Sequence, residues 1–147
     1  MGIIQNFVLI HAVLGWVLAQ ILKLFVGIWK EKRFSFTFLL SAGGIPSSHS
    51  ATVCALATST GRQYGFDSAI FAISVIFAFI VMYDAAGVRR AAGEQAKILN
   101  RMMRDLDRGD TTNVQKELKE LIGHTPFEVF AGAVLGIFIP FIFYFST

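Results

Sequence analysis

Residues Ile70–Val81 read IFAISVIFAFIV, an apolar run without a charged residue. The run forms the centre of a longer segment, residues 66–88, whose length is about what a helix needs to cross a bilayer. Residues 3–28 and 129–145 are two further segments of this kind. We therefore expect the fold to be all-α and built around helices that cross a membrane.

The composition supports a membrane protein. Of the 147 residues, 54% are hydrophobic, 16% are charged and fifteen are Phe, whereas a soluble domain has about 25% charged residues. The length fits one integral membrane domain over residues 1–147. The single cysteine, Cys54, excludes an intrachain disulfide and a cysteine-based zinc cluster. No charge precedes the first apolar segment, which is long for a signal-peptide core, so we expect an uncleaved membrane helix.

A polar stretch, Gly43–Ser50 (GGIPSSHS), lies between these apolar segments. Pro46 suits the first turn of a helix, and Ser47 or Ser48 suits its start. We expect this second helix to run from Ser47 to about Gly61. It is rich in Ser, Thr and Ala, which favours a place inside the bundle. The stretch itself has two interpretations: a polar turn between membrane helices, or a loop that presents His49 and backbone N–H groups to an anion.

The remaining segments complete the expected architecture. Residues 34–42 are apolar but too short to cross, so we expect a re-entrant or interfacial piece. Helical propensity continues past residue 88, and residues 97–123 are polar, with a break around 109–111 and a short helix from Thr112 or Asn113 to about Ile122. Gly132 and Gly136 form a small-residue packing stripe. The sequence thus predicts a polytopic bundle of about four transmembrane helices with a cytoplasmic helical loop at about residues 89–123.

The charges predict an orientation. If residues 3–28, 47–61, 66–88 and 129–145 all cross, eleven of the thirteen Lys and Arg residues lie on one side, in residues 30–46 and 89–124. The positive-inside rule places that side in the cytoplasm, with both termini outside, and we expect a bacterial plasma membrane. The unusual polar residues gather at the same face. They are Lys23, Ser47, Ser48, His49, Asp84, Arg89, Arg90, His124 and Glu128. We add Gly44 of the polar stretch as a further candidate for binding an anion, and Asp84 and Gln20 as supporting residues.

Such a set of side chains suits a phosphate group. Arg binds phosphate oxygens as a bidentate fork and Lys adds a point charge, while one His can attack phosphorus and the other can protonate the leaving oxygen. Glu128 lies one helical turn after His124 and could orient its ring. This chemistry needs neither a metal nor a cofactor.

Each of these residues also has a structural interpretation. Lys23 could reach the interface along its own stem. Arg89 and Arg90 could be ordinary positive-inside residues, and Glu94 could pair with Arg90. Glu128 could complement the helix dipole. His11 lies at the opposite face, and we expect it to be structural or interfacial.

Two motifs resemble a known superfamily. Pro46-Ser47-Ser48-His49 resembles the PSGH motif of the type 2 phosphatidic acid phosphatases, which are related to vanadium haloperoxidases. The segment 123–132, GHTPFEVFAG, resembles their third motif, G-x-H-x-x-x-D-V-x-x-G, with Glu for Asp. GGIPSSHSA and YDAAGVRRAAGEQAKILN are similar to the divergent branch of the superfamily, and that similarity covers nearly the whole chain.

The resemblance implies a set of roles. His124 would be the nucleophile that forms a phospho-histidine, Glu128 would orient it, and His49 would protonate the leaving alkoxide. Ser47 and the Ser48 N–H would bind phosphate, and Lys23 would stand for the Lys of the first motif. The Arg that the family places six residues before the nucleophile is Leu118 here, so Arg89 or Arg90 would have to replace it. Ser48 also replaces the Gly of the second motif.

The expected function is therefore that of a metal-independent lipid phosphate phosphatase with a phospho-histidine intermediate. Phosphatidic acid, phosphatidylglycerol phosphate and isoprenoid (di)phosphates are compatible substrates. The alternative is a catalytically inactive protein that binds a phospholipid headgroup, and a third interpretation is a helical packing protein that uses the Gly132 and Gly136 stripe. The expected partners are the lipid phosphate and the bilayer, with no nucleic acid. A homodimer is one way to complete a pocket among only four spans.

Overall fold

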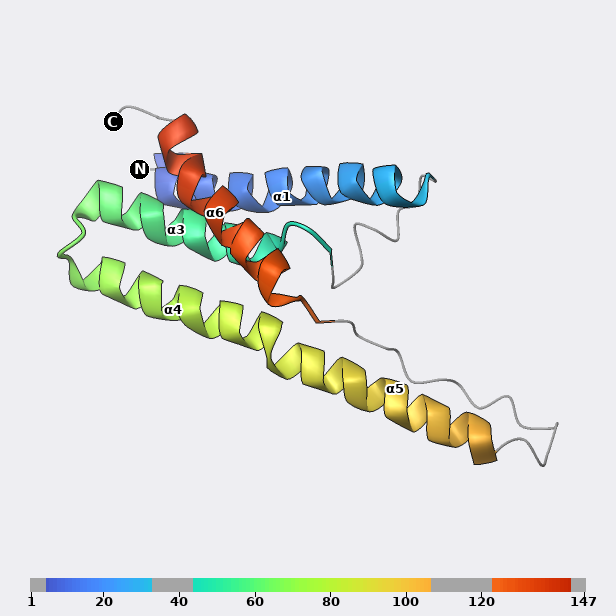
Figure 1. Cartoon of the computed structure of the whole chain (residues 1–147). Coiled ribbons are helices and arrows are strands. Elements are labelled where there is room, and N and C mark those ends of the chain that lie inside the picture. The colour runs from blue at the N-terminus through green and yellow to red at the C-terminus, as the bar shows by residue number, and fades with distance from the viewer. Residues whose placement is uncertain (1–4, 33–43, 107–122, 144–147) are drawn as a thin grey trace.

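A computed structural model describes residues 5–32, 44–106 and 123–143, and the described residues form helices without a β-strand (Figure 1). This confirms the expected all-α membrane bundle. The expected re-entrant piece at residues 34–42 and the short helix before Ile122 lie outside the described residues. The helices are α1 (Phe7–Glu31), α3 (Ser48–Tyr64), α4 (Ala69–Ala86), α5 (Val88–Leu106) and α6 (Pro126–Ile142).

Polar caps decide where three of these helices begin. The Asn6 side chain accepts a hydrogen bond from the Leu9 N–H (3.1 Å), and the Ser68 hydroxyl accepts one from the Phe71 N–H (3.2 Å). Thr125 caps α6 in the same way. A side-chain oxygen at this position satisfies an N–H group that has no partner within the helix. The apolar runs predict that these helices begin at residues 3, 66 and 129. With their caps, the helices begin at residues 7, 69 and 126 instead.

Helix α3 lies at the centre of the bundle and packs against α1, α4 and α6. Its small residues make this possible: Ala51 and Ala55 are fully buried, and Ser50, Ser59 and Thr60 are buried as well. In Figure 1, α6 crosses α3 obliquely while α1 and α4 run along its two sides. The prediction that this short, Ser-, Thr- and Ala-rich helix lies inside the bundle is confirmed.

Glycines bring the helix backbones into direct contact. A Cβ atom on Gly136 would collide with the Ala51 carbonyl oxygen, and one on Gly132 would collide with the Ser47 carbonyl oxygen. From α1, a Cβ on Gly15 would lie 2.8 Å from the same Ala51 carbonyl oxygen. The predicted stripe is thus confirmed as a packing surface, and its partner is the backbone of α3. Small residues at such crossings are typical of helices in membranes.

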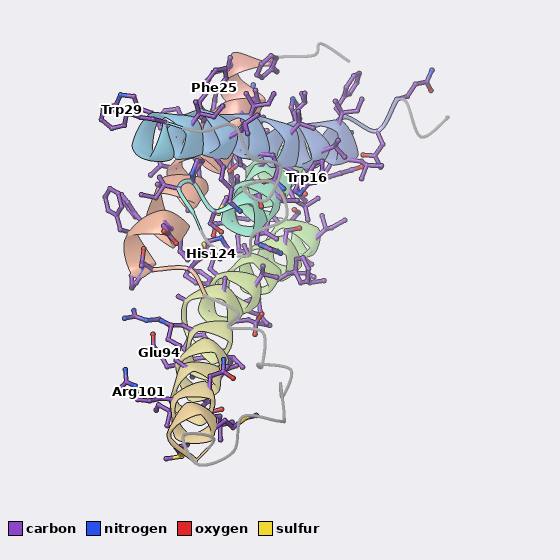
Figure 2. The ribbon with its side chains drawn as sticks, turned by 90° about the vertical axis from the view of Figure 1, so that its right-hand side faces the viewer. Trp16, Phe25, Trp29, Glu94, Arg101 and His124 are labelled. Atoms are coloured by element: carbon purple, nitrogen blue, oxygen red, sulfur yellow. The ribbon has the colours of Figure 1, made fainter. Side chains whose placement is uncertain are left out.

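The outer surface of the bundle is apolar. Helix α4 exposes Ile73, Ile76, Phe79 and Ile80, and Trp29 of α1 projects away from the bundle (Figure 2). Residues Phe7–Trp29 and Ala69–Met103 are long and apolar enough to cross a bilayer, and Pro126–Ile142 is a shorter apolar helix. An apolar surface of this extent is suited to lipid rather than to water.

A buried polar cluster ties three helices together at the end near the two termini. His11 of α1 has its Nδ1 atom 2.7 Å from the Ser59 hydroxyl, and its Nε2 atom donates to the Phe143 carbonyl oxygen at 2.7 Å. The Arg62 guanidinium donates to the Pro140 carbonyl oxygen and lies 4.5 Å from the centre of the Phe141 ring. His11 is therefore a structural residue, as expected, at the opposite end from the candidate site.

Candidate functional site

The imidazole rings of His49 and His124 lie side by side at the end of the bundle where α3 and α6 begin. Their centroids are 5.8 Å apart and the rings meet edge to face, at 77°. His49 belongs to the first turn of α3 and is exposed, whereas His124 precedes α6 and is only 2% exposed. The structure thus brings together two residues that are 75 positions apart in the chain.

The end of α4 holds His124 in place. The His124 N–H donates to the Ala85 carbonyl oxygen at 3.1 Å, and Ala85 itself is buried. Figure 2 shows His124 close to the point where α4 and the first turn of α6 approach each other. Asp84 precedes Ala85 and is half-buried, so the sequence-predicted supporting carboxylate lies on the segment that contacts His124 through its backbone.

Ser47 is the N-cap of α3. Its hydroxyl accepts hydrogen bonds from the Ser50 N–H (3.4 Å) and the Ser50 hydroxyl (3.1 Å), and its N–H donates to the Glu128 carbonyl oxygen (3.0 Å). Ser47 is fully buried. The expected cap is confirmed, but the placement of Pro46 in the first turn is wrong, because the extended backbone of Ser47 separates Pro46 from the helix.

The first turn of α3 is the part of this loop that suits an anion. Ser48 and His49 follow the cap, and the N–H groups at these positions of a helix have no acceptor within the helix. The helix dipole adds a partial positive charge at the same point. Ser48 is nevertheless 6% exposed, so a ligand would reach this turn mainly beside the exposed His49.

Lys23 reaches this end of the bundle from α1. It is only 5% exposed, and its side chain runs against Gly44, where a Cβ atom would lie 2.8 Å from the Lys23 Cε atom. Gly44 also has a φ of +115°, a conformation that favours glycine. Gln20, the other predicted supporting residue of α1, lies about one turn before Lys23 and is half-buried. Gly44 therefore leaves room for the side chain of Lys23, the only Lys or Arg of residues 3–28.

Glu128 and Thr125 form a capping box at the start of α6. The Glu128 carboxylate accepts from the Thr125 N–H (3.0 Å), and the Thr125 hydroxyl accepts from the Glu128 N–H (3.3 Å). Glu128 also attracts the Lys23 ammonium electrostatically. Thr125 was not among the predicted site residues, although Thr-Pro-Phe-Glu ahead of an apolar run has the S/T-x-x-E pattern of such a box. The orientation of the His124 ring by Glu128 stays a prediction.

The two arginines belong to α5, which begins directly after Gly87. Arg90 is exposed, and the side chain of Arg89 lies outside the described residues. Glu94, which could have paired with Arg90, forms an ion pair with Lys97 at 3.2 Å. Replacement of the Arg missing at Leu118 by Arg89 or Arg90 stays a prediction, and Leu118 also lies outside the described residues.

Residues from α1, α3, α6 and the segment before α6 thus converge on one end of the bundle. They supply two imidazoles, an ammonium group, a carboxylate and the first turn of a helix. Two imidazoles can divide nucleophilic attack and proton transfer between them. An ammonium group and a helix N-terminus both favour a negatively charged ligand. The arrangement is therefore suited to a phosphate group.

The comparisons with known proteins place the chain in a family. Residues 4–139 match the divergent PAP2 family. The chain is also 40% identical over 149 residues to the "Uncharacterized membrane protein YuiD" of Bacillus subtilis (strain 168), which covers 95% of this chain and 94% of that protein. No solved structure gave a significant match. The match extends over both histidine motifs and the helices that carry them, and the chain is therefore a member of the divergent PAP2 family.

Proposed function

We propose that this membrane protein is a metal-independent lipid phosphate phosphatase that acts through a phospho-histidine intermediate. The observation that carries the proposal is the pairing of His49 and His124, with ring centroids 5.8 Å apart at the N-terminal end of α3. A nucleophile must lie about 3 Å from the atom it attacks, and a general acid must lie within about 3 Å of its proton acceptor. Two imidazoles at this spacing are close enough for both to reach one phosphate group.

The proposed reaction has two steps. In the first, a ring nitrogen of His124 attacks phosphorus, the bond to the lipid oxygen breaks, and His49 gives that oxygen a proton. In the second, water attacks the phospho-histidine, His49 accepts the proton of the water, and inorganic phosphate leaves. Lys23 and the first turn of α3 would stabilise the charge that develops on the phosphoryl oxygens. Glu128 would stabilise the charged form of His124 between the steps.

The position of the site favours a lipid as the carrier of the phosphate. His49 and His124 lie at an end of helices whose outer surfaces are apolar. Phe127 and Phe130, on the first turns of α6, are both about two-thirds exposed. An amphiphile could therefore place its phosphate at the histidine pair while its chains lie against the bundle. Phosphatidic acid, phosphatidylglycerol phosphate and isoprenoid (di)phosphates have this form.

A second candidate function is binding of a phospholipid headgroup without hydrolysis. Three observations favour it: His124 is only 2% exposed, the Ser47 hydroxyl caps α3, and the Glu128 carboxylate caps α6. Groups that already satisfy the helix ends are less available to a reacting phosphate. A site of this kind could hold a headgroup with Lys23, His49 and the helix N-terminus alone.

Phosphate release by the purified full-length protein distinguishes the two functions. The assay uses each of the three lipid substrates in mixed micelles, with a chelator present. We expect turnover by the wild-type protein and an acid-labile phosphorylated intermediate, with both lost in His124→Ala. His49→Ala should slow the reaction roughly 10²–10⁴-fold, the usual contribution of a general acid. Gln63→Ala is the control, because Gln63 is exposed at the far end of α3.

Two results would count against the phosphatase. Turnover that persists in His124→Ala would remove the assigned nucleophile. Binding of phosphatidic acid by the wild-type protein, without turnover on any of the three substrates, would favour the headgroup-binding function instead.

A further inference from the structure

Helix α3 has one side that the other described helices leave open. Helices α1, α4 and α6 all pack against α3, whereas α1 and α4, over their described residues, do not contact each other. Figure 1 shows α1 and α4 along two sides of α3 and α6 across a third. The open side of α3 is therefore the one that faces away from α6, between α1 and α4.

The contacts of α3 show which of its residues lie on each covered side. Every neighbouring helix meets residues that recur at intervals of three or four, as expected for one side of a helix. These residues are Ser47, Ser50 and Ala51 toward α6, Ala51, Ala55 and Ser59 toward α1, and Val53, Cys54 and Gly61 toward α4.

The open side carries His49, Thr52 and Leu56. They are the residues of 47–57 that are not buried: His49 is exposed, and Thr52 and Leu56 are half-buried. Their spacing of three and seven positions places them on one side of the helix. The Thr52 hydroxyl donates to the Ser48 carbonyl oxygen at 2.7 Å, which leaves the methyl group of Thr52 for an apolar contact. The open side thus offers an apolar surface that begins next to His49.

Trp16 of α1 borders this surface. A Cβ on the adjacent Gly15 would touch Ala51 and Ala55 of α3, so Trp16 lies at the level of the two half-buried residues of the open side. Trp16 is 50% exposed, and Figure 2 shows it on the side of α3 away from α6. Its ring therefore provides an apolar wall beside the surface of α3.

The place of His49 on the open side favours the chain of a bound lipid as the occupant. Thr52 and Leu56 lie about 4.5 and 10.5 Å from His49 along the helix axis, in the direction from the end of the bundle toward its centre. An acyl chain attached to a phosphate at His49 extends in the same direction. A second copy of the protein on this side would instead cover His49, the exposed ring beside the buried His124.

We propose that an acyl chain of the bound lipid phosphate lies along the open side of α3, over Thr52 and Leu56 and beside Trp16. The proposal rests on the phosphate binding at the histidine pair that the proposed function requires. It applies to a phosphatase and to a headgroup-binding protein alike. It also names the feature that selects a phosphatidyl lipid over a soluble phosphate ester, which has no chain to place on this surface.

The two tryptophans of the chain test the proposal in the full-length protein. Trp29→Phe leaves Trp16 as the single tryptophan, and Trp16→Phe leaves Trp29, which projects away from the bundle, as the matched control. Each protein is reconstituted into phosphatidylcholine vesicles that contain a small fraction of a non-hydrolysable phosphonate analogue of phosphatidic acid with brominated acyl chains. Bromine quenches tryptophan fluorescence only at short range. The same fraction of brominated phosphatidylcholine measures quenching by the bulk bilayer.

We expect the phosphonate to quench Trp16 at least twofold more than brominated phosphatidylcholine does, and the two lipids to quench Trp29 equally. Thr52→Phe, which fills the open side, should abolish the excess at Trp16, whereas Val134→Phe on the exposed side of α6 should retain it. Equal quenching of Trp16 by the two lipids would overturn the proposal. Excess quenching at a Phe130→Trp probe, but not at Trp16, would overturn it in favour of the outer surface of α6.

The quenching needs no hydrolysis, so this proposal and the phosphatase can fail separately. Excess quenching of Trp16 without phosphate release would support the chain position in a headgroup-binding protein. Phosphate release without that excess would retain the phosphatase and overturn the chain position. Spontaneous disulfide formation between two copies of Leu56→Cys, in a Cys54→Ala background, would also overturn it and assign the open side to a second copy.

Discussion

Glu128 takes part in two interactions that a pair of substitutions can separate. Its carboxylate accepts the Thr125 N–H in the capping box, and its negative charge attracts Lys23. A glutamine keeps an oxygen for the cap and removes the charge. Glu128→Ala removes both, so we expect it to lower the free energy of unfolding by about 0.5–2 kcal/mol, whereas Glu128→Gln should leave that free energy nearly unchanged.

The expected effect of these two substitutions on catalysis differs from their expected effect on stability. If the charge of Glu128 supports His124, both variants should lose most of the phosphatase activity, even though only Glu128→Ala unfolds at a lower temperature. Thermal unfolding in detergent and phosphate release on the same preparations give the two readouts. Full activity in Glu128→Gln would limit Glu128 to its capping role.

Gly44 and Lys23 should act as one unit in phosphate binding. Gly44→Ala would place a methyl group 2.8 Å from the Lys23 Cε atom and would strain a backbone at φ +115°. We expect it to displace the ammonium group and to weaken binding of vanadate or phosphate as Lys23→Met does. The loss of one charged hydrogen bond corresponds to about 1.5–3 kcal/mol, or at least roughly tenfold in affinity.

A double-mutant cycle measured by titration calorimetry tests this coupling. Because both changes remove the same contact, Gly44→Ala combined with Lys23→Met should bind little more weakly than either single variant. Additive losses would mean that Gly44 acts on the site independently of Lys23.

At the level of single residues, the sequence predicted the role of a residue better than it predicted which residues that residue contacts. The Ser47 cap could be predicted because serine before a small, polar helix is a strong local signal. The contact of the His49 and His124 rings could not, because it depends on how α3, α4 and α6 pack. The hydrogen bond from the His124 N–H to the Ala85 carbonyl oxygen joins two backbone groups. No residue type in the sequence indicates such a bond.

At the level of helices, the glycine contacts of α6 determine its distance from α3. Gly136→Ala would force a methyl group into the Ala51 carbonyl oxygen, so the two helices would have to separate. We expect a loss of about 1–3 kcal/mol in the free energy of unfolding, typical of overpacking. The matched control is Val134→Ala on the exposed side of α6, which should change that free energy by less than about 0.5 kcal/mol.

Gly132→Ala should affect function as well as stability. Gly132 meets the Ser47 carbonyl oxygen, next to the cap that positions His49. We therefore expect a larger loss of phosphate release per folded molecule in Gly132→Ala than in Gly136→Ala. Unfolding is followed by circular dichroism in detergent, and equal activity losses in the two variants would contradict this order.

The helices themselves could be predicted from apolar runs, and their limits could not. Phe66 looks like part of a span, yet the chain turns through residues 65–68 before Ser68 caps α4. Val129 looks like the first residue of the last span, but Pro126 begins α6 because Thr125 and Glu128 form a capping box. Hydropathy reports which residues prefer lipid, whereas local hydrogen bonds determine where a helix begins.

At the level of the whole molecule, the distribution of charge predicts which end of the bundle faces the cytoplasm. Eleven of the thirteen Lys and Arg residues lie in residues 30–46 and 89–124, which adjoin the end that holds His49 and His124. Basic residues close to the ends of membrane helices are retained in the cytoplasm. We therefore expect the histidine pair at the cytoplasmic face and both termini outside.

Reporter fusions in a bacterial host test this orientation. A reporter active only outside the cytoplasm and one fluorescent only inside it are fused after Gly65, after Arg101 and after Thr147. The outside reporter should be active at Gly65 and Thr147, and the inside reporter should be fluorescent at Arg101. The reverse pattern would place the histidine pair at the outer face. In that case the lipid phosphate would have to come from the outer leaflet.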